Sequence, residues 1–121
     1  MTFSLVALIT ALATLGLGLG FLFASPFMLK QWGLDHPPAA GLVSRRIGAV
    51  YLGISVLLFL VRSDPAASAV TAISAGVATA TGLLAILGLI EMKSGRASAG
   101  ILVAVAVEML LTLGFLSVLR G

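Results

Sequence analysis

The stretch GILVAVAVEMLLTLGF, residues Gly100–Phe115, decides the fold of this chain. It is a continuous run of mainly apolar side chains in which Glu108 is the only ionisable residue. Such a run lacks the alternation of apolar and polar side chains that marks the strands of a membrane barrel. The whole run covers residues 97–119, and roughly 20 helical residues cross a hydrocarbon core of about 30 Å. The sequence therefore predicts a membrane-spanning helix with a carboxylate inside it.

Three further runs of the same kind precede this one, over residues 3–24, 39–61 and 66–90. The chain has 121 residues, of which 60% are hydrophobic and 9% are charged, whereas about 25% of the residues in soluble domains are charged. Its mean hydropathy is +1.23. We therefore expect a single domain over residues 1–121 that is all-α, an integral membrane four-helix bundle.

The first run stands where a secretory signal peptide would stand, but two features argue against cleavage. No Lys or Arg precedes the apolar stretch, and Pro26 closely follows the segment where a signal peptidase would act. We expect residues 3–24 to remain in the protein as its first helix.

The connection after the first run contains the only Trp and the only His of the chain, Trp32 and His36. Phe27, Met28 and Trp32 surround Lys30, and this mixture of apolar and cationic side chains is typical of segments at the lipid headgroups. We expect a short amphipathic segment that anchors the loop at the interface. A loop that gates access to a ligand is the alternative.

The connections also carry residues that commonly begin and end helices. Asp35 is the expected N-cap of the second helix, and Asp64 or Ser63 is the expected N-cap of the third. Gly95 is expected to end the third helix, because glycine adopts the left-handed conformation that often follows a helix.

The net charge of +3 does not indicate a nucleic-acid partner, because the seven Lys and Arg residues stand at the ends of apolar runs. The first and third connections share one side of the membrane, and together with the start of the second run they carry most of these cations: Lys30, Arg45, Arg46, Lys93 and Arg96. Cytoplasmic loops of membrane proteins are enriched in Lys and Arg. We therefore expect a multi-pass protein of a cell membrane with these two connections in the cytoplasm and both termini outside.

Metal and cofactor chemistry is not indicated by the composition. The chain has no Cys, which excludes disulfides and thiolate metal sites, and its single His cannot form an imidazole cluster within one chain. We predict no metal and no cofactor.

Small residues are expected to bring the helices together, because close backbone approach drives helix association in lipid. The expected packing positions are Gly16, Gly20, Gly48, Gly53, Gly76, Gly100 and Ala104. The third run has two stripes of small residues, one through Gly76 and one through Ala78. One bundle does not need both stripes, so the surplus favours a homodimer or a larger membrane complex.

The position of Glu108 is explained by the small residues of its own run. Steps of four residues place Gly100, Ala104, Glu108 and Thr112 on one face of a helix. A carboxylate facing lipid would cost several kcal/mol, with estimates that start at about 2.5 kcal/mol. We therefore expect Glu108 to face the interior of the bundle together with the small residues.

The expected partner of Glu108 is an arginine of the second run. If that helix begins near Pro38, Arg46 lies about 12 Å along it and enters the membrane from the same side as Glu108. The sequence predicts an Arg46–Glu108 ion pair, with Arg45 as the alternative partner. Tyr51 and Thr112 would add hydroxyl groups to such a site, although hydroxyls inside helices commonly bond back to their own backbone.

The chain resembles a family of bacterial four-helix membrane proteins that is known only as a domain of unknown function. The resemblance is carried by a glycine-rich first run that closes on Pro26, by the segment RRIGAVYLG at 45–53, and by a glutamate inside the fourth run. It covers most of the chain. It implies a four-helix fold in a bacterial inner membrane and draws attention to Arg46 and Glu108, but it implies no activity.

We expect a non-catalytic membrane protein, either a binder of lipids or small ligands or an accessory subunit, built around the buried Arg–Glu pair. The alternative is a dimeric proton-coupled small transporter that uses Glu108 to bind a proton and a substrate in turn. An enzyme acting on a lipidic substrate is the third reading. General acid–base chemistry normally needs a second titratable group within reach, and His36 lies in a loop. We therefore expect no enzyme activity.

Overall fold

The computed structural model describes residues 2–63 and 65–121, and this part of the chain is helical with no strand. This part contains four long helices and one short helix, and a single turn of 3-10 helix (η1) precedes the last long helix. Their bounds are Phe3–Phe23 (α1), Ser25–Gln31 (α2), Pro38–Val61 (α3), Ala67–Lys93 (α4), Ala99–Ile101 (η1) and Leu102–Arg120 (α5). The all-α four-helix prediction is confirmed, and the four long helices fall on the four apolar runs.

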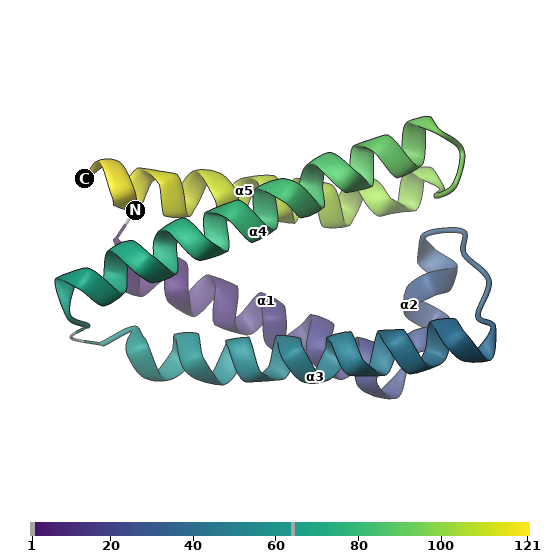
Figure 1. Ribbon diagram of the computed structural model, residues 1–121, viewed down its shortest axis with the longest axis horizontal. Helices are drawn as coiled ribbons and strands as arrows, with labels where there is room; N and C mark the ends of the chain where they lie inside the picture. Colours follow the sequence, from purple (N-terminus) through teal and green to yellow (C-terminus); the bar gives the residue numbers. More distant parts are fainter. Residues whose placement is uncertain (1, 64) are drawn as a thin grey trace.

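The long helices form two antiparallel pairs, α1 with α3 and α4 with α5 (Figure 1). Each of the four is long and apolar enough to cross a membrane, with the last span counted from η1, so the chain is a multi-pass membrane protein. Both termini and the α3–α4 connection lie at one end of the molecule, and α2 and the α4–α5 turn lie at the other (Figure 1). The first and third connections therefore share one side, as expected.

The α1–α3 pair is held by a contact between two glycines. A Cβ atom on Gly48 would lie 2.8 Å from the backbone nitrogen of Leu22 and 2.9 Å from the carbonyl oxygen of Gly18. Real side chains do not approach backbone so closely, so only glycine fits where α3 crosses α1. Further along the pair, the Ser55 hydroxyl donates a hydrogen bond of 2.6 Å to the carbonyl oxygen of Ala11.

Three of the expected packing glycines do not pack helices together. Gly16, Gly53 and Gly76 have no other part of the chain within 4 Å of an added Cβ atom. The prediction for these three is wrong, because spacing of four residues defines a stripe but does not say which stripe faces a neighbour. Gly20 does make a close contact, but with the Met28 side chain of α2 instead of a spanning helix.

The α4–α5 pair uses the other stripe of small residues on α4. The buried positions of α4 are Ser74, Ala78, Thr81, Ala85 and Gly88. A Cβ atom on Gly88 would lie 2.6 Å from the Val105 side chain, and the hydroxyls of Thr81 and Thr112 are 2.7 Å apart. The stripe through Ala78 is therefore the packing stripe, whereas the stripe through Gly76 is left uncovered by any helix.

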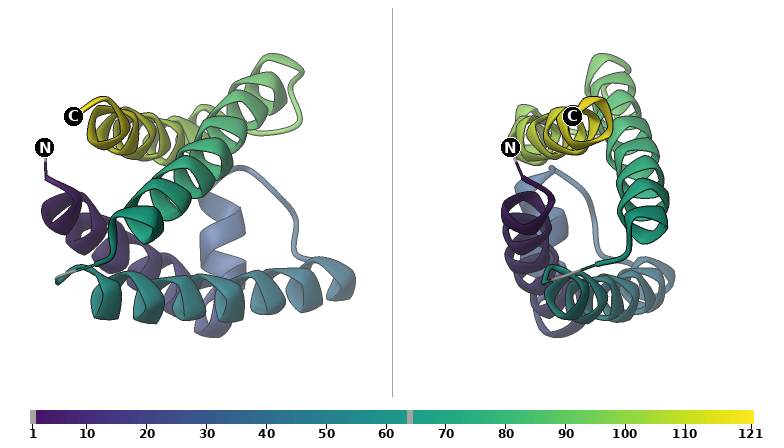
Figure 2. Two further views of the ribbon diagram at one scale, coloured as in Figure 1. Left: turned by 60° about the vertical axis from the view of Figure 1, so that its left-hand side comes forward. Right: turned by 90° about the vertical axis from the view of Figure 1, so that its left-hand side faces the viewer.

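The two pairs are joined at both ends of the molecule. Near the termini, the rings of Phe3 and Phe115 meet edge to face with centroids 6.4 Å apart, inside the main apolar core. At the opposite end, the Ser98 backbone N–H donates a 2.8 Å hydrogen bond to the carbonyl oxygen of Trp32. An added Cβ at Gly100 would overlap the carbonyl oxygen of Gln31, so Gly100 lets η1 rest on the end of α2. The helices surround a central space between these two closures (Figure 2).

The expected caps are only partly found. The N-cap of α3 is Pro37 and that of α4 is Ala66, and neither makes a side-chain capping bond. Asp35 and Ser63 therefore do not cap these helices, because each helix begins too far along the chain; Asp64 lies outside the described residues. Gly95, with φ of +83°, follows α4 as predicted.

The connection after α1 folds as the helix α2, and only part of it has the surroundings expected of an interfacial anchor. Phe27 and Lys30 are exposed. Met28 instead packs on Gly20, and Trp32 packs edge to face on Phe21 with ring centroids 5.7 Å apart. The segment therefore closes one end of the bundle with its apolar side.

Candidate functional site: a cavity between the helix pairs

A cavity of about 960 Å³ lies between the two helix pairs and is lined by residues from α1 to α5. Ligand sites in proteins typically have volumes of about 300–1,000 Å³, so this cavity is at the upper end of that range. Most lining side chains are apolar. The polar exceptions are Thr10, Thr14, Gln31, Trp32, Tyr51, Thr81 and Glu108.

Small residues produce this space. Gly76 and Ala80 of α4 form part of one wall, and Gly100 of η1 and Ala104 of α5 form part of another. At Gly76 even an added Cβ atom would meet nothing within 4 Å. The stripe that was expected to mediate helix contacts therefore leaves room between the pairs.

Glu108 faces this cavity from the middle of α5, which confirms the prediction that it points into the bundle. Its backbone carbonyl accepts a 2.8 Å hydrogen bond from the Thr112 hydroxyl. Within residues 2–63 and 65–121, its carboxylate takes part in no hydrogen bond and no ion pair with a Lys, Arg or His side chain. The acid is half-buried, and no cation of these residues balances its charge.

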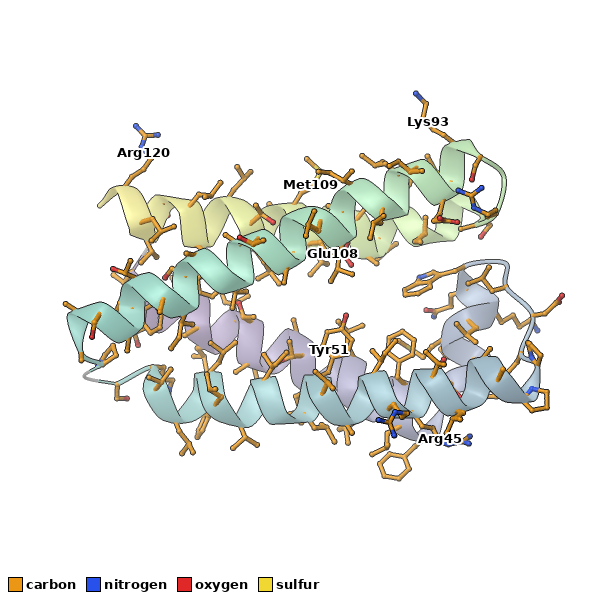
Figure 3. The ribbon with its side chains drawn as sticks, in the orientation of Figure 1. Arg45, Tyr51, Lys93, Glu108, Met109 and Arg120 are labelled. Carbon is orange, nitrogen blue, oxygen red and sulfur yellow. The ribbon has the colours of Figure 1, made fainter. Side chains whose placement is uncertain are left out.

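The predicted ion pair between Glu108 and Arg46 or Arg45 is wrong. Both arginines are exposed, and Figure 3 shows Arg45 on the outer side of α3, pointing away from Glu108. Tyr51 of the same helix lines the cavity. It lies five residues after Arg46, which turns it about 140° around the helix axis. The depth of the arginines along α3 was compatible with an ion pair to Glu108, but their positions around the helix axis were not.

The one ion pair in the described part of the chain is instead at the end of α4. Arg96 Nε lies 2.6 Å from a carboxylate oxygen of Glu91. This hydrogen bond raises the pKa of the Arg96 guanidinium above its ordinary value. The charge of Glu91 is therefore balanced, unlike that of Glu108.

A cluster of three aromatic rings, which was not predicted from the sequence, lies at the α2 end of the cavity. The Phe21 ring packs edge to face on Trp32 and stacks on Tyr51, with centroids 5.7 Å and 6.2 Å apart. Trp32 and Tyr51 both line the cavity. Tyr51 points from α3 into the space between the pairs, on the wall opposite Glu108 (Figure 3). The available signal was that the chain has a single Trp and a single Tyr.

A second, smaller cavity of about 160 Å³ adjoins the first. Glu108, Trp32, Leu84 and Ala104 line both cavities, and Glu91 lines only the small one. The space around Glu108 therefore extends toward the end of α4 that carries the Glu91–Arg96 pair.

The other polar residues have structural roles. Thr112 bonds to Thr81 and back to its own helix, as the alternative reading of its hydroxyl expected. Thr10, Thr14 and Thr81 also donate hydrogen bonds to carbonyls of their own helices. His36 does not line the cavity; its Nε2 atom lies 2.8 Å from the Ser25 hydroxyl at the start of α2.

No protein-family model, curated protein or solved structure matches this chain. The family resemblance inferred from the sequence therefore stays a prediction, and function has to be argued from the cavity itself.

Proposed function

We propose that the protein is a membrane-embedded, non-catalytic binding protein that holds a small hydrophobic or lipidic ligand between its two helix pairs. The observation that carries this proposal is the cavity of about 960 Å³ with mainly apolar walls. The space opens between the two pairs, so apolar molecules can enter it and gain dispersion contacts with its walls. A space of this size between membrane helices is therefore expected to be occupied by a molecule with apolar surface.

The site also has the polar groups that orient a ligand. Tyr51 and Glu108 face the cavity from opposite walls, and Gln31 and Trp32 face it from the end closed by α2. A few polar groups in an otherwise apolar pocket are the usual arrangement for specific recognition of a small molecule.

The experiment uses Trp32, the only Trp of the chain, as an internal probe of the cavity. The neutral dye N-phenyl-1-naphthylamine accepts energy from tryptophan when it binds nearby. We expect saturable energy transfer from Trp32 in the purified protein above that of empty micelles. A variant with Gly76→Phe and Ala80→Phe fills the cavity from one wall and should lose most of this signal.

The matched control places the same side chains outside the cavity. Gly16 and Gly53 are exposed, have open space around an added Cβ and do not line the cavity. The variant with Gly16→Phe and Gly53→Phe should bind the dye as the wild type does. Equal binding by both double variants would place the dye on the lipid-facing surface and contradict the proposal.

Proton-coupled transport is the second candidate function. It is supported by the carboxylate of Glu108, which faces the cavity without a cationic partner in the described chain. A proton and a substrate could then compete for this one acid. Release of protons when a cationic compound is added to lightly buffered purified protein would favour transport over simple binding.

We also propose an orientation of the protein in the membrane and the partners that it contacts there. The cations near the shared end of α2 and the α4–α5 turn support a cytoplasmic location for that end. Membrane lipids are the partners that the apolar outer surface implies. The exposed glycines Gly16 and Gly53 leave room for a second copy or another membrane subunit to pack closely.

A further inference from the structure

We infer that the ligand of this cavity is a hydrophobic monocation, whose positive charge lies against Glu108 and the rings of Trp32 and Tyr51. The inference rests on the proposed function, since it names the chemical class of the ligand for the same cavity. It is carried by the charges of the cavity wall, by the unpaired state of one acid and by the geometry of the aromatic cluster.

The cavity wall carries one acidic side chain and no basic one. Of the described residues that line it, Glu108 is the only carboxylate, and none is Lys, Arg or His. The wall therefore complements a molecule with a single positive charge. An anion would meet apolar surface and a carboxylate, and would lose its hydration without gaining a partner.

Residues 2–63 and 65–121 supply no counter-charge for Glu108. Of the arginines that were expected to fill this role, Arg45 points outward from α3 and Arg46 is exposed. The described ion pair joins Glu91 to Arg96. A carboxylate in apolar surroundings is costly unless it is paired. A cationic group of the ligand would supply the partner that the fold leaves out.

The aromatic cluster adds a second element of cation recognition. Cations are attracted to the faces of Trp and Tyr rings within about 6 Å of the ring centroid. Trp32 and Tyr51 both line the cavity, and Phe21, which is 5% exposed and lines it too, packs against both rings. This packing fixes the orientation of the two rings, so their surfaces need no reordering when a cation binds.

The remaining walls determine the rest of the ligand. They are formed mainly by Leu, Ile, Val, Ala and Gly side chains, which favour bulky apolar substituents around the charge. A second acid, Glu91, lines the small adjoining cavity, and its charge is already balanced by Arg96. One free carboxylate fits a monocation better than a dication.

The test compares two ions of nearly the same size and opposite charge, tetraphenylphosphonium and tetraphenylborate. Binding is followed by Trp32 fluorescence in detergent, above an empty-micelle baseline, and the neutral naphthylamine dye is measured in parallel. We expect the phosphonium ion to bind at least tenfold more tightly than the borate. In Glu108→Gln, the dissociation constant of the phosphonium ion should rise at least tenfold while that of the neutral dye changes little.

Two further variants keep the result interpretable. Asp35→Asn removes one negative charge from an exposed loop outside the cavity and should leave all three affinities unchanged. Glu108→Asp retains the carboxylate and should keep the preference for the cation, which covers the case in which Glu108→Gln does not fold.

The outcomes separate the two proposals. Equal binding of the phosphonium and borate ions, or an unchanged phosphonium affinity in a folded Glu108→Gln, would overturn the cationic ligand while dye binding still supported the cavity as a binding site. If neither the dye nor the phosphonium ion binds the wild type, the proposed function fails and the inference fails with it.

Discussion

Gly48 of α3 lies against the backbone of α1 at Gly18, so that an added Cβ atom on Gly48 would be 2.9 Å from the Gly18 carbonyl oxygen and 2.8 Å from the Leu22 nitrogen. These neighbours are backbone atoms of another helix, which cannot move aside as a flexible side chain can. The contact fixes how α3 crosses α1, and with it the direction in which Tyr51, three residues further along α3, faces the cavity.

Gly48→Ala should therefore destabilise the protein although it adds only one methyl group. Overpacking of a tight contact costs about 1–3 kcal/mol, and we expect a clearly lower melting temperature in detergent. Gly53→Ala is the control, because its Cβ would meet nothing within 4 Å on the same helix. Equal melting temperatures for the two variants would mean that the α1–α3 crossing is looser than described.

The hydrogen bond between Thr81 and Thr112 should contribute measurably to the α4–α5 pair. Their hydroxyls are 2.7 Å apart, and interhelical hydrogen bonds in membranes couple by about 0.6 kcal/mol on average and about 1.7 kcal/mol at most. Thr81→Val, Thr112→Val and the double variant form a cycle whose coupling energy should fall in this range.

A threonine without such a partner provides the control for that cycle. Thr79 is exposed and donates only to the Ala75 carbonyl of its own helix. Combined with Thr112→Val, Thr79→Val should give additive changes in the free energy of unfolding. Coupling of the same size in both cycles would show that the effect does not come from the Thr81–Thr112 bond.

Cysteine labelling tests the orientation of the protein in the membrane. The chain has no Cys, so a single engineered one reports one site. Ser63, after α3, and Ser94, in the α4–α5 turn, are both exposed. A membrane-impermeant thiol reagent added outside should modify Ser63→Cys and spare Ser94→Cys. The opposite pattern would reverse the proposed orientation.

The sequence was sufficient to predict the four spanning helices, because length and hydropathy decide which segments cross a membrane. It was also sufficient to predict that Glu108 faces inward, because exposing a carboxylate to lipid costs several kcal/mol. The prediction failed where rotation around a helix matters. Gly16 and Gly18 belong to the same glycine-rich segment, and only the packed structure shows that Gly18 meets α3.

The cavity could not have been predicted for a related reason. Stripes of small residues are compatible with close helix contact and equally with an open space, and the choice depends on how the two pairs are joined. Here the Phe3–Phe115 contact and the Ser98–Trp32 hydrogen bond hold the pairs at their two ends. The stripe through Gly76 consequently faces a space instead of a helix.

Glu108→Gln should leave the stability of the ligand-free protein nearly unchanged, since no ion pair is lost. Removing one partner of a buried pair typically costs about 3–5 kcal/mol, whereas an unpaired carboxylate contributes nothing that glutamine cannot replace. Arg46→Leu should likewise have a small effect, because Arg46 is exposed. We expect the free energy of unfolding of each single variant to lie within about 0.5 kcal/mol of the wild type, as is usual for changes away from packed or paired sites.

The double variant decides between this arrangement and the ion pair predicted from the sequence. Changes at sites that share no contact add within about 0.5 kcal/mol, so Glu108→Gln combined with Arg46→Leu should give the sum of the two single effects in thermal or denaturant unfolding. Large losses in the single variants that are partly recovered in the double variant would instead restore the Arg46–Glu108 pair. Such a pair would neutralise the cavity wall, and the case for a cationic ligand would fall with it. Additivity would leave Glu108 without a partner among the described residues, and its carboxyl group would then be free to bind a proton or a cationic ligand.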